Sequence, residues 1–229
     1  MAEEIYMMVI SYRFRSPFFT LTMEKRSSLS TGVADIISSF SKETTNFLSY
    51  RSMRYDGDII FWCSSHSPET LESIKYTLND KFTGYLKANY SMISLYEDSP
   101  YLKPGLALDD TLRQDPMKYF VAYPMSKEPE WYLIDYEERK KIMAEHIGMA
   151  LADPEGRSVR SYTTYSYGLG DQEFVVIYET DSLAAWSHAT KKLREAKARK
   201  WIINETPILV GIHKAAGALL LNDQKRESS

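Results

Sequence analysis

Cysteine and histidine are scarce in this chain of 229 residues, which contains one Cys and four His. The single Cys63 excludes an intrachain disulfide and any zinc or iron–sulfur site built from several cysteines. Cys63 ends the apolar run 59–63, so we interpret it as a packed hydrophobic residue and not as a reactive thiol. Any histidine chemistry is confined to His66, His146, His188 and His213.

Concentrated positive charge and long apolar runs are also missing. Lys and Arg total 28 against 31 Asp and Glu, and no basic block occurs, which disfavours a nucleic-acid partner. No apolar run is long enough to cross a bilayer, and the acidic start at Glu3 and Glu4 lacks the basic region of a signal or transit peptide. With 44% hydrophobic and 26% charged residues, we expect a globular, cytoplasmic protein.

Several common catalytic motifs are absent. The segment Gly168-Leu169-Gly170 joins two predicted strands, whereas a dinucleotide-binding loop must lie between a strand and a helix. The chain has no Gly-x-Ser-x-Gly elbow and no His-Glu-x-x-His pair. Ordinary serine-hydrolase and zinc-protease chemistry is therefore disfavoured.

The hydrophobic pattern predicts one order of elements, β-α-β-β-α-β, which occurs twice. In the first half the predicted strands are 5–14, 47–55, 59–64 and 90–97, and the helices are 24–40 and 67–82. In the second half the predicted strands are 118–124, 160–167, 174–179 and 207–212, and the helices are 136–151 and 182–201. A turn signal joins the two middle strands of each half, at residues 56–58 and again at residues 168–171.

This repeat predicts an α+β fold in which tandem ferredoxin-like units join their sheets into a barrel with the helices outside. We expect an N-terminal repeat at residues 1–110, a C-terminal repeat at residues 111–221 and a flexible polar tail at residues 222–229. The interior of such a barrel could hold a small molecule.

Among the histidines, His146 has the most informative surroundings. It ends the predicted helical stretch 137–145, and the apolar run 147–151 that follows offers no carboxylate to complete a zinc site. A histidine at a helix end is most often a partner of the helix dipole, but a single histidine in apolar surroundings suits haem iron better than zinc. The other three histidines lie in polar, unexceptional contexts.

One long segment resembles a known family. The strand ending Tyr123-Pro124-Met125-Ser126-Lys127, the pair Trp131-Tyr132 and the helix from Tyr136 to His146 are similar to the chlorite dismutase superfamily, most of all to its coproheme decarboxylase (HemQ-like) branch. The similarity continues through residues 168–174, where the family usually has Gly-Leu-Asp-Asp, and through residues 209–211. It covers most of the second half, whereas the first half matches mainly in topology.

The resemblance implies a tandem ferredoxin-like barrel that assembles as a homopentamer, binds haem or coproheme and uses hydrogen peroxide as oxidant. It implies that His146 is the proximal ligand of the haem iron. Tyr123 matches the tyrosine that becomes a radical and takes hydrogen from a propionate, and Lys127 matches the lysine beside that propionate. Arg194 matches an arginine that binds another propionate; Arg113 is a looser match because its loop is shorter than in the family.

Two departures from the family separate its branches. Ser161 aligns with the distal position, where chlorite dismutases have arginine and many decarboxylases have glutamine; a shift of one residue would place Arg160 there instead. Ala198 aligns with the glutamate that supports the proximal histidine in chlorite dismutases. Both changes disfavour chlorite decomposition. The leading interpretation is decarboxylation of coproheme to haem b; the alternatives are a haem carrier, sensor or weak peroxidase, or a barrel that has lost haem and serves as a scaffold.

Overall fold

The computed structural model describes residues 4–98 and 107–221, so the predicted tail at residues 222–229 lies outside the described residues. The strands are β1 (Ile5–Phe14), β2 (Asn46–Ser52), β3 (Ile59–Ser65), β4 (Leu86–Tyr96), β5 (Tyr119–Lys127), β6 (Val159–Tyr165), β7 (Phe174–Thr180), β8 (Ile202–Ile203) and β9 (Leu209–His213). The α-helices are α1 (Ser16–Phe19), α2 (Met23–Ser39), α3 (Pro68–Phe82), α4 (Leu108–Leu112), α5 (Glu130–Leu133), α6 (Tyr136–Ala152) and α7 (Leu183–Leu193).

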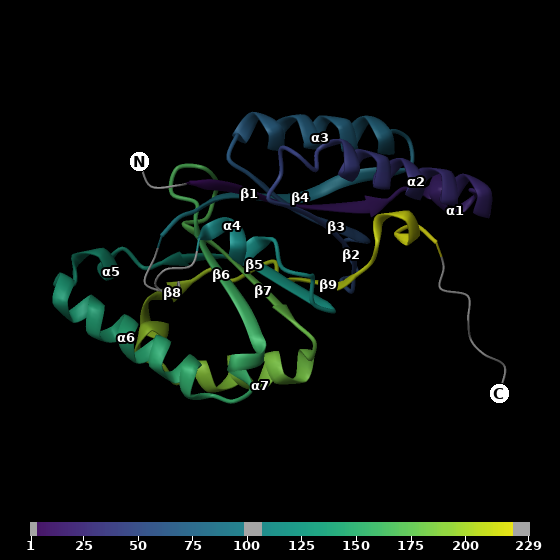
Figure 1. Cartoon of the computed structure of the whole chain (residues 1–229). Coiled ribbons are helices and arrows are strands. Elements are labelled where there is room, and N and C mark those ends of the chain that lie inside the picture. The colour runs from purple at the N-terminus through teal and green to yellow at the C-terminus, as the bar shows by residue number, and fades with distance from the viewer. Residues whose placement is uncertain (1–3, 99–106, 222–229) are drawn as a thin grey trace, which may run out of the picture.

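The strands close into a barrel. Their order is β7-β6-β4-β1-β3-β2-β9-β5, and β5 pairs back with β7, while the short β8 adds to the end of β5. All the pairings are antiparallel. Helices α2 and α3 lie over one side of the barrel, and α6 and α7 lie over the opposite side (Figure 1). The predicted α+β barrel with external helices is confirmed.

In the first half the helices pack tightly on the outer face of the sheet. Helix α3 begins at Pro68, and the Ser67 side chain caps it by accepting the Thr70 N–H. Its apolar stripe has the spacing of one helix face and is almost fully buried: Leu71, Ile74, Leu78 and Phe82. With α2 and strands β1 to β4 this stripe forms one continuous hydrophobic core.

The barrel interior is filled by side chains, contrary to the expectation that it could hold a small molecule. The Tyr50 ring stacks on Phe120 with centroids 4.5 Å apart, and Trp62 lies 5.0 Å from Tyr162. All four side chains are at most 4% exposed. Large aromatic residues from both halves meet here, so the space for a ligand lies elsewhere.

In the second half the helices cover the sheet loosely. Ile142 is the buried residue of α6, and Ala189 is the buried residue of α7. Helix α6 matches the predicted helix 136–151 to within one residue, so the separate expectation that His146 ends its helix is wrong. The residues after His146 are mostly Ala, Met and Leu, which favour helix. Conversely, α7 ends at Leu193 because Ala196 adopts an extended backbone, and a short 3₁₀ turn (Lys197–Trp201) replaces the predicted helical end.

Helix α4 connects the two halves. The Asp109 carboxylate accepts hydrogen bonds from Thr45 at 2.9 Å and from His66 at 3.0 Å, and it pairs with Arg113 at 3.1 Å. The predicted boundary between residues 110 and 111 therefore falls within an element that is bound to the first half, and the two-repeat division stays a prediction. Within the described ranges, no helix is long and apolar enough to cross a membrane.

Candidate functional site

The outer face of strand β5 carries the first part of the site. Side chains alternate across a strand, so Tyr123, Met125 and Lys127 share one face, while Phe120 and Ala122 belong to the barrel interior. The three outward side chains line a cavity under helices α6 and α7.

Two adjoining cavities lie on this face. The smaller has a volume of about 80 Å³ and the larger about 620 Å³. They share the lining residues His146, Thr163, Tyr178, Trp186 and Leu193. Sites for small molecules typically measure about 300–1,000 Å³, so the larger cavity, which His146 also lines, can accommodate a ligand of cofactor size.

Four of the residues predicted from sequence meet in the smaller cavity. Tyr123 and Lys127 come from β5, His146 from α6 and Arg194 from the end of α7. Ser161 and Arg160 both line the larger cavity. Arg113 is not among the residues that line either cavity; its side chain is 62% exposed and pairs with Asp109.

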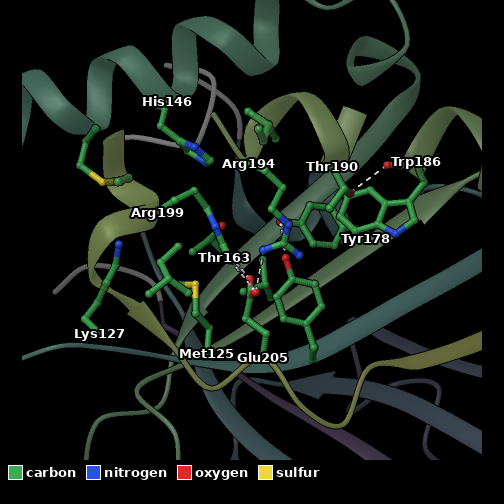
Figure 2. A pocket seen from close by; sticks show the side chains of 16 residues that line it. Met125, Lys127, His146, Thr163, Tyr178, Trp186, Thr190, Arg194, Arg199 and Glu205 are labelled. Carbon is green, nitrogen blue, oxygen red and sulfur yellow. Dashed lines mark hydrogen bonds and ion pairs between the residues drawn. The ribbon is translucent and has the colours of Figure 1, made fainter. Parts of the chain in front are cut away.

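His146 projects from α6 into the cavity, between the strands and α7 (Figure 2). Burial lowers the pKa of His146, and the nearby cations of Lys127 and Arg199 lower it further, so its imidazole is neutral at pH 7. Its Nδ1 is buried and has no hydrogen-bond partner among the described residues. Ala198 lines the same cavity and has no side-chain acceptor to offer it. A neutral imidazole is the form of histidine that binds metal ions.

Lys127 is a buried cation, with 7% of the residue exposed. Its ammonium nitrogen lies 4.3 Å from the centroid of the Trp131 ring. Burial, and then the charge of Arg199, lowers the pKa of Lys127 to about 8. At pH 7 the side chain therefore still carries a charge that a carboxylate could neutralise.

An arginine pair at the cavity was only partly predicted. Arg194 donates to the Glu205 carboxylate at 2.8 Å, and Arg199 donates to both oxygens of the same carboxylate at 2.6 and 2.9 Å. Figure 2 shows the two guanidinium groups converging on Glu205. Arg199 was missed because a continuous helix through residue 201 would place the side chains of Arg194 and Arg199 about 140° apart around its axis. Glu205 lies beyond that predicted helix and was missed as well.

Two tyrosines and a tryptophan form the wall of the cavity. The phenol oxygens of Tyr123 and Tyr178 lie 3.5 Å apart, and the centroid of the Tyr178 ring lies 4.1 Å from that of Trp186. Burial raises the pKa of Tyr123, so its phenol keeps its proton at neutral pH. Tyr178 and Trp186 had no predicted role.

Strand β6 places Arg160 and Ser161 on opposite faces. Ser161 pairs with Tyr178 across the ladder and lies on the same strand face as Thr163, which lines both cavities. The Arg160 guanidinium donates to the Asp115 carbonyl at 2.6 Å and to the buried Glu179 at 3.5 Å. Ser161 therefore shares the strand face of Thr163, whereas Arg160, which also lines the larger cavity, directs its guanidinium at Asp115 and Glu179.

The fold and this cavity define a class: a closed α+β barrel whose second half carries a single-histidine site rich in arginine and aromatic residues. A family model described as chlorite dismutase matches residues 22–214, and the chain belongs to that family.

Relatives and solved structures agree with this assignment. The chain is 28% identical over 162 residues to the coproheme decarboxylase of Mycolicibacterium smegmatis, a match that covers 69% of this chain and 68% of that protein. A crystal structure described as a candidate chlorite dismutase is 48% identical, with a TM-score of 0.89 over 95% of this chain and 98% of that one. A haem-binding protein of Thermus thermophilus shares the fold, with 18% identity and a TM-score of 0.82 over 96% and 97% of the two chains.

Proposed function

We propose that this protein binds an iron porphyrin through His146 and decarboxylates the propionates of coproheme, with hydrogen peroxide as the oxidant. The observation that carries the proposal is the meeting of Tyr123, Lys127, His146 and Arg194 around one cavity, although they come from three separate elements. The relative from M. smegmatis is named for this activity, and the T. thermophilus structure is described as haem-binding.

The residues present fit an iron porphyrin. His146 offers a neutral imidazole in a cavity that also holds Trp186, Met125 and Leu193 for contact with a flat apolar ring. Lys127 and Arg194 provide charges for carboxylates at the edge of such a ring. The bound iron would supply the oxidising capacity that peroxide delivers.

The side chains of the cavity then have distinct tasks. Tyr123 is a buried, protonated phenol beside Tyr178, so it can give up a proton and an electron and then accept a hydrogen atom from a propionate carbon. Lys127 holds the carboxylate of that propionate in place. For each propionate, loss of one hydrogen and CO₂ leaves a vinyl group and releases two electrons; with one proton taken up, peroxide becomes two molecules of water.

A haem protein without decarboxylase activity is the second candidate. It would be a carrier, a sensor or a weak peroxidase. The observation in its favour is the proximal environment: Nδ1 of His146 has no acceptor within the described part of the chain, whereas ligating histidines normally donate this N–H to a carboxylate or carbonyl. Ser161 offers a hydroxyl but no charge to retain a chlorite-derived anion, and the guanidinium of Arg160, which also lines the larger cavity, is directed at Asp115 and Glu179. We therefore do not propose chlorite decomposition.

The deciding experiment is a titration with coproheme followed by peroxide. We expect a Soret band in the wild type that is lost in His146→Ala, and then mass losses corresponding to CO₂ and hydrogen after peroxide is added. Tyr123→Phe should keep the Soret band and lose the decarboxylation. A normal band with no mass loss in the wild type would favour the carrier, sensor or peroxidase; no band would leave the scaffold interpretation. The homopentamer and the cytoplasmic location stay predictions.

A further inference from the structure

Glu205 is an unexpected carboxylate at this site. A cavity that binds propionates needs free cations, yet Arg194 and Arg199 both direct their guanidinium groups at Glu205 (Figure 2). The Arg199 contact uses two nitrogens and two oxygens, which is the geometry with which arginine binds a ligand carboxylate. Glu205 therefore occupies the position on the arginines that a ligand carboxylate would take.

The Glu205 carboxylate is ionised at neutral pH. Burial alone would raise the pKa of Glu205, but the hydrogen bonds from Arg199 and Arg194 outweigh burial and hold this pKa below its usual value. Its side chain is 19% exposed, so water screens the two ion pairs only partly. Among the residues that line the smaller cavity, Glu205 is the acidic one, against the cations Lys127, Arg194 and Arg199.

We propose that Glu205 is a specificity-determining residue that competes with the carboxylates of the porphyrin for Arg194 and Arg199. The inference rests on the proposed function, because it assumes that a carboxylated porphyrin is the ligand. Each ligand carboxylate that reaches the arginines must displace Glu205 first. The site therefore binds anionic porphyrins less tightly than its three cations would allow. When a product that has lost carboxylates dissociates, Glu205 forms its ion pairs with the two arginines again.

A structural role makes a different forecast. In a purely structural role, Glu205 would only hold the end of α7 against the segment before β9 through its ion pairs. Removing its charge would then lower the melting temperature, and ligand binding would weaken or stay unchanged. Competition forecasts tighter binding. The two roles therefore differ in the sign of the change in affinity.

The test measures binding of metal-free coproporphyrin, a tetracarboxylate, by fluorescence at low salt, with its uncharged tetramethyl ester as the comparison ligand. We expect Glu205→Gln to bind coproporphyrin about tenfold more tightly than the wild type, since a charged hydrogen-bonding competitor is removed. Affinity for the ester should stay unchanged. Glu195→Gln is the matched control, because Glu195 is an exposed neighbour that lines neither cavity.

Equal affinities in Glu205→Gln and Glu195→Gln would overturn the competition while leaving porphyrin binding intact, and so would weaker binding in Glu205→Gln. If the wild type bound neither porphyrin, both this inference and the proposed function would fail. Should Glu205→Gln not fold, Glu205→Asp provides the second measurement. Its shorter side chain cannot keep all three contacts, so tighter coproporphyrin binding is expected and its absence counts against the proposal.

Discussion

Tyr123 and Tyr178 stand on neighbouring antiparallel strands with their phenol oxygens 3.5 Å apart. Their rings are nearly parallel, at 26° to each other. This contact links the tyrosine proposed to react with a second phenol that also packs on Trp186. Tyr178 is therefore the described group best placed to hold the Tyr123 hydroxyl in one orientation.

Loss of the Tyr178 hydroxyl should slow the reaction without abolishing it. In Tyr178→Phe the Tyr123 phenol loses its hydrogen-bond partner but keeps its ring environment, so we expect decarboxylation to slow by about tenfold, the free-energy equivalent of one hydrogen bond. Single-turnover loss of coproheme after peroxide measures this. Tyr119→Phe on the same strand lines neither cavity and should react at the wild-type rate; a Tyr178→Phe rate equal to it would exclude this positioning role.

The pH dependence of ligand binding should follow Lys127. Its pKa is about 8, so the ammonium charge that attracts carboxylates is present below pH 8 and is lost as the pH rises above it. We expect the affinity for metal-free coproporphyrin to fall between pH 7 and pH 9 in the wild type. In Lys127→Met the affinity should be lower at pH 7 and flat across this window; a fall of the same size in the variant would assign the titration to another group.

The same shift makes a separate forecast for the ligand-free protein. The folded state holds Lys127 at a lower pKa than an unfolded chain does, so between about pH 8 and pH 10 the unfolded state binds more protons. The contribution of Lys127 to the free energy of unfolding therefore becomes more favourable as the pH rises through this window. Urea unfolding at pH 8 and pH 10 should show a larger pH-dependent gain for wild type than for Lys127→Met.

Iron ligation should be restorable at His146 by a small molecule. His146→Gly removes the imidazole from a cavity that has room for it, so added imidazole should restore a Soret band like that of the wild type. The pKa of His146 is lowered, so the wild-type band should also survive acidification below the usual histidine pKa of about 6.5. His188→Gly on the α7 surface is the control; if His188→Gly and not His146→Gly lost the band, the ligand assignment would be wrong.

Core substitutions should affect the two halves unequally. Leu78 is fully buried in the first-half core, so Leu78→Ala should reduce the free energy of unfolding by about 3 kcal/mol. Leu193 is only partly buried and borders both cavities, so Leu193→Ala should cost about 1 kcal/mol. Urea denaturation of the two variants measures the difference, and equal losses would show that the second-half helices are packed as tightly as α3.

The sequence predicted the order of elements well because the hydrophobic pattern of each half switches clearly between the two-residue period of strands and the roughly 3.6-residue period of helices. Strand β1 and helix α3 have the predicted spans almost to the residue, because the alternating apolar run and the Ser67-Pro68 start signal are local features. Helix ends were harder. The position of His146 within α6 and the break of α7 after Leu193 depend on backbone choices that several helix-forming residues leave open.

The candidate site was predicted through the resemblance and not through periodicity. Tyr123, Lys127 and Arg194 would each read as an ordinary strand or surface residue if taken alone. Arg199 and Glu205 were not foreseen, because their pairing depends on a 3₁₀ turn and a loop that bring distant residues together. The location of the cavity outside the barrel also depends on tertiary packing, since Tyr50, Trp62 and Phe120 fill the interior.

The helices cover the two sides of the barrel unequally, and this affects where the chain can tolerate substitutions. The first half packs α2 and α3 on its strands through one continuous buried core. Helices α6 and α7, with one buried residue each, are then free to vary in the residues that face the ligand. Substitutions under the loosely packed helices can therefore change which ligand binds at a smaller cost in stability than substitutions in the first-half core.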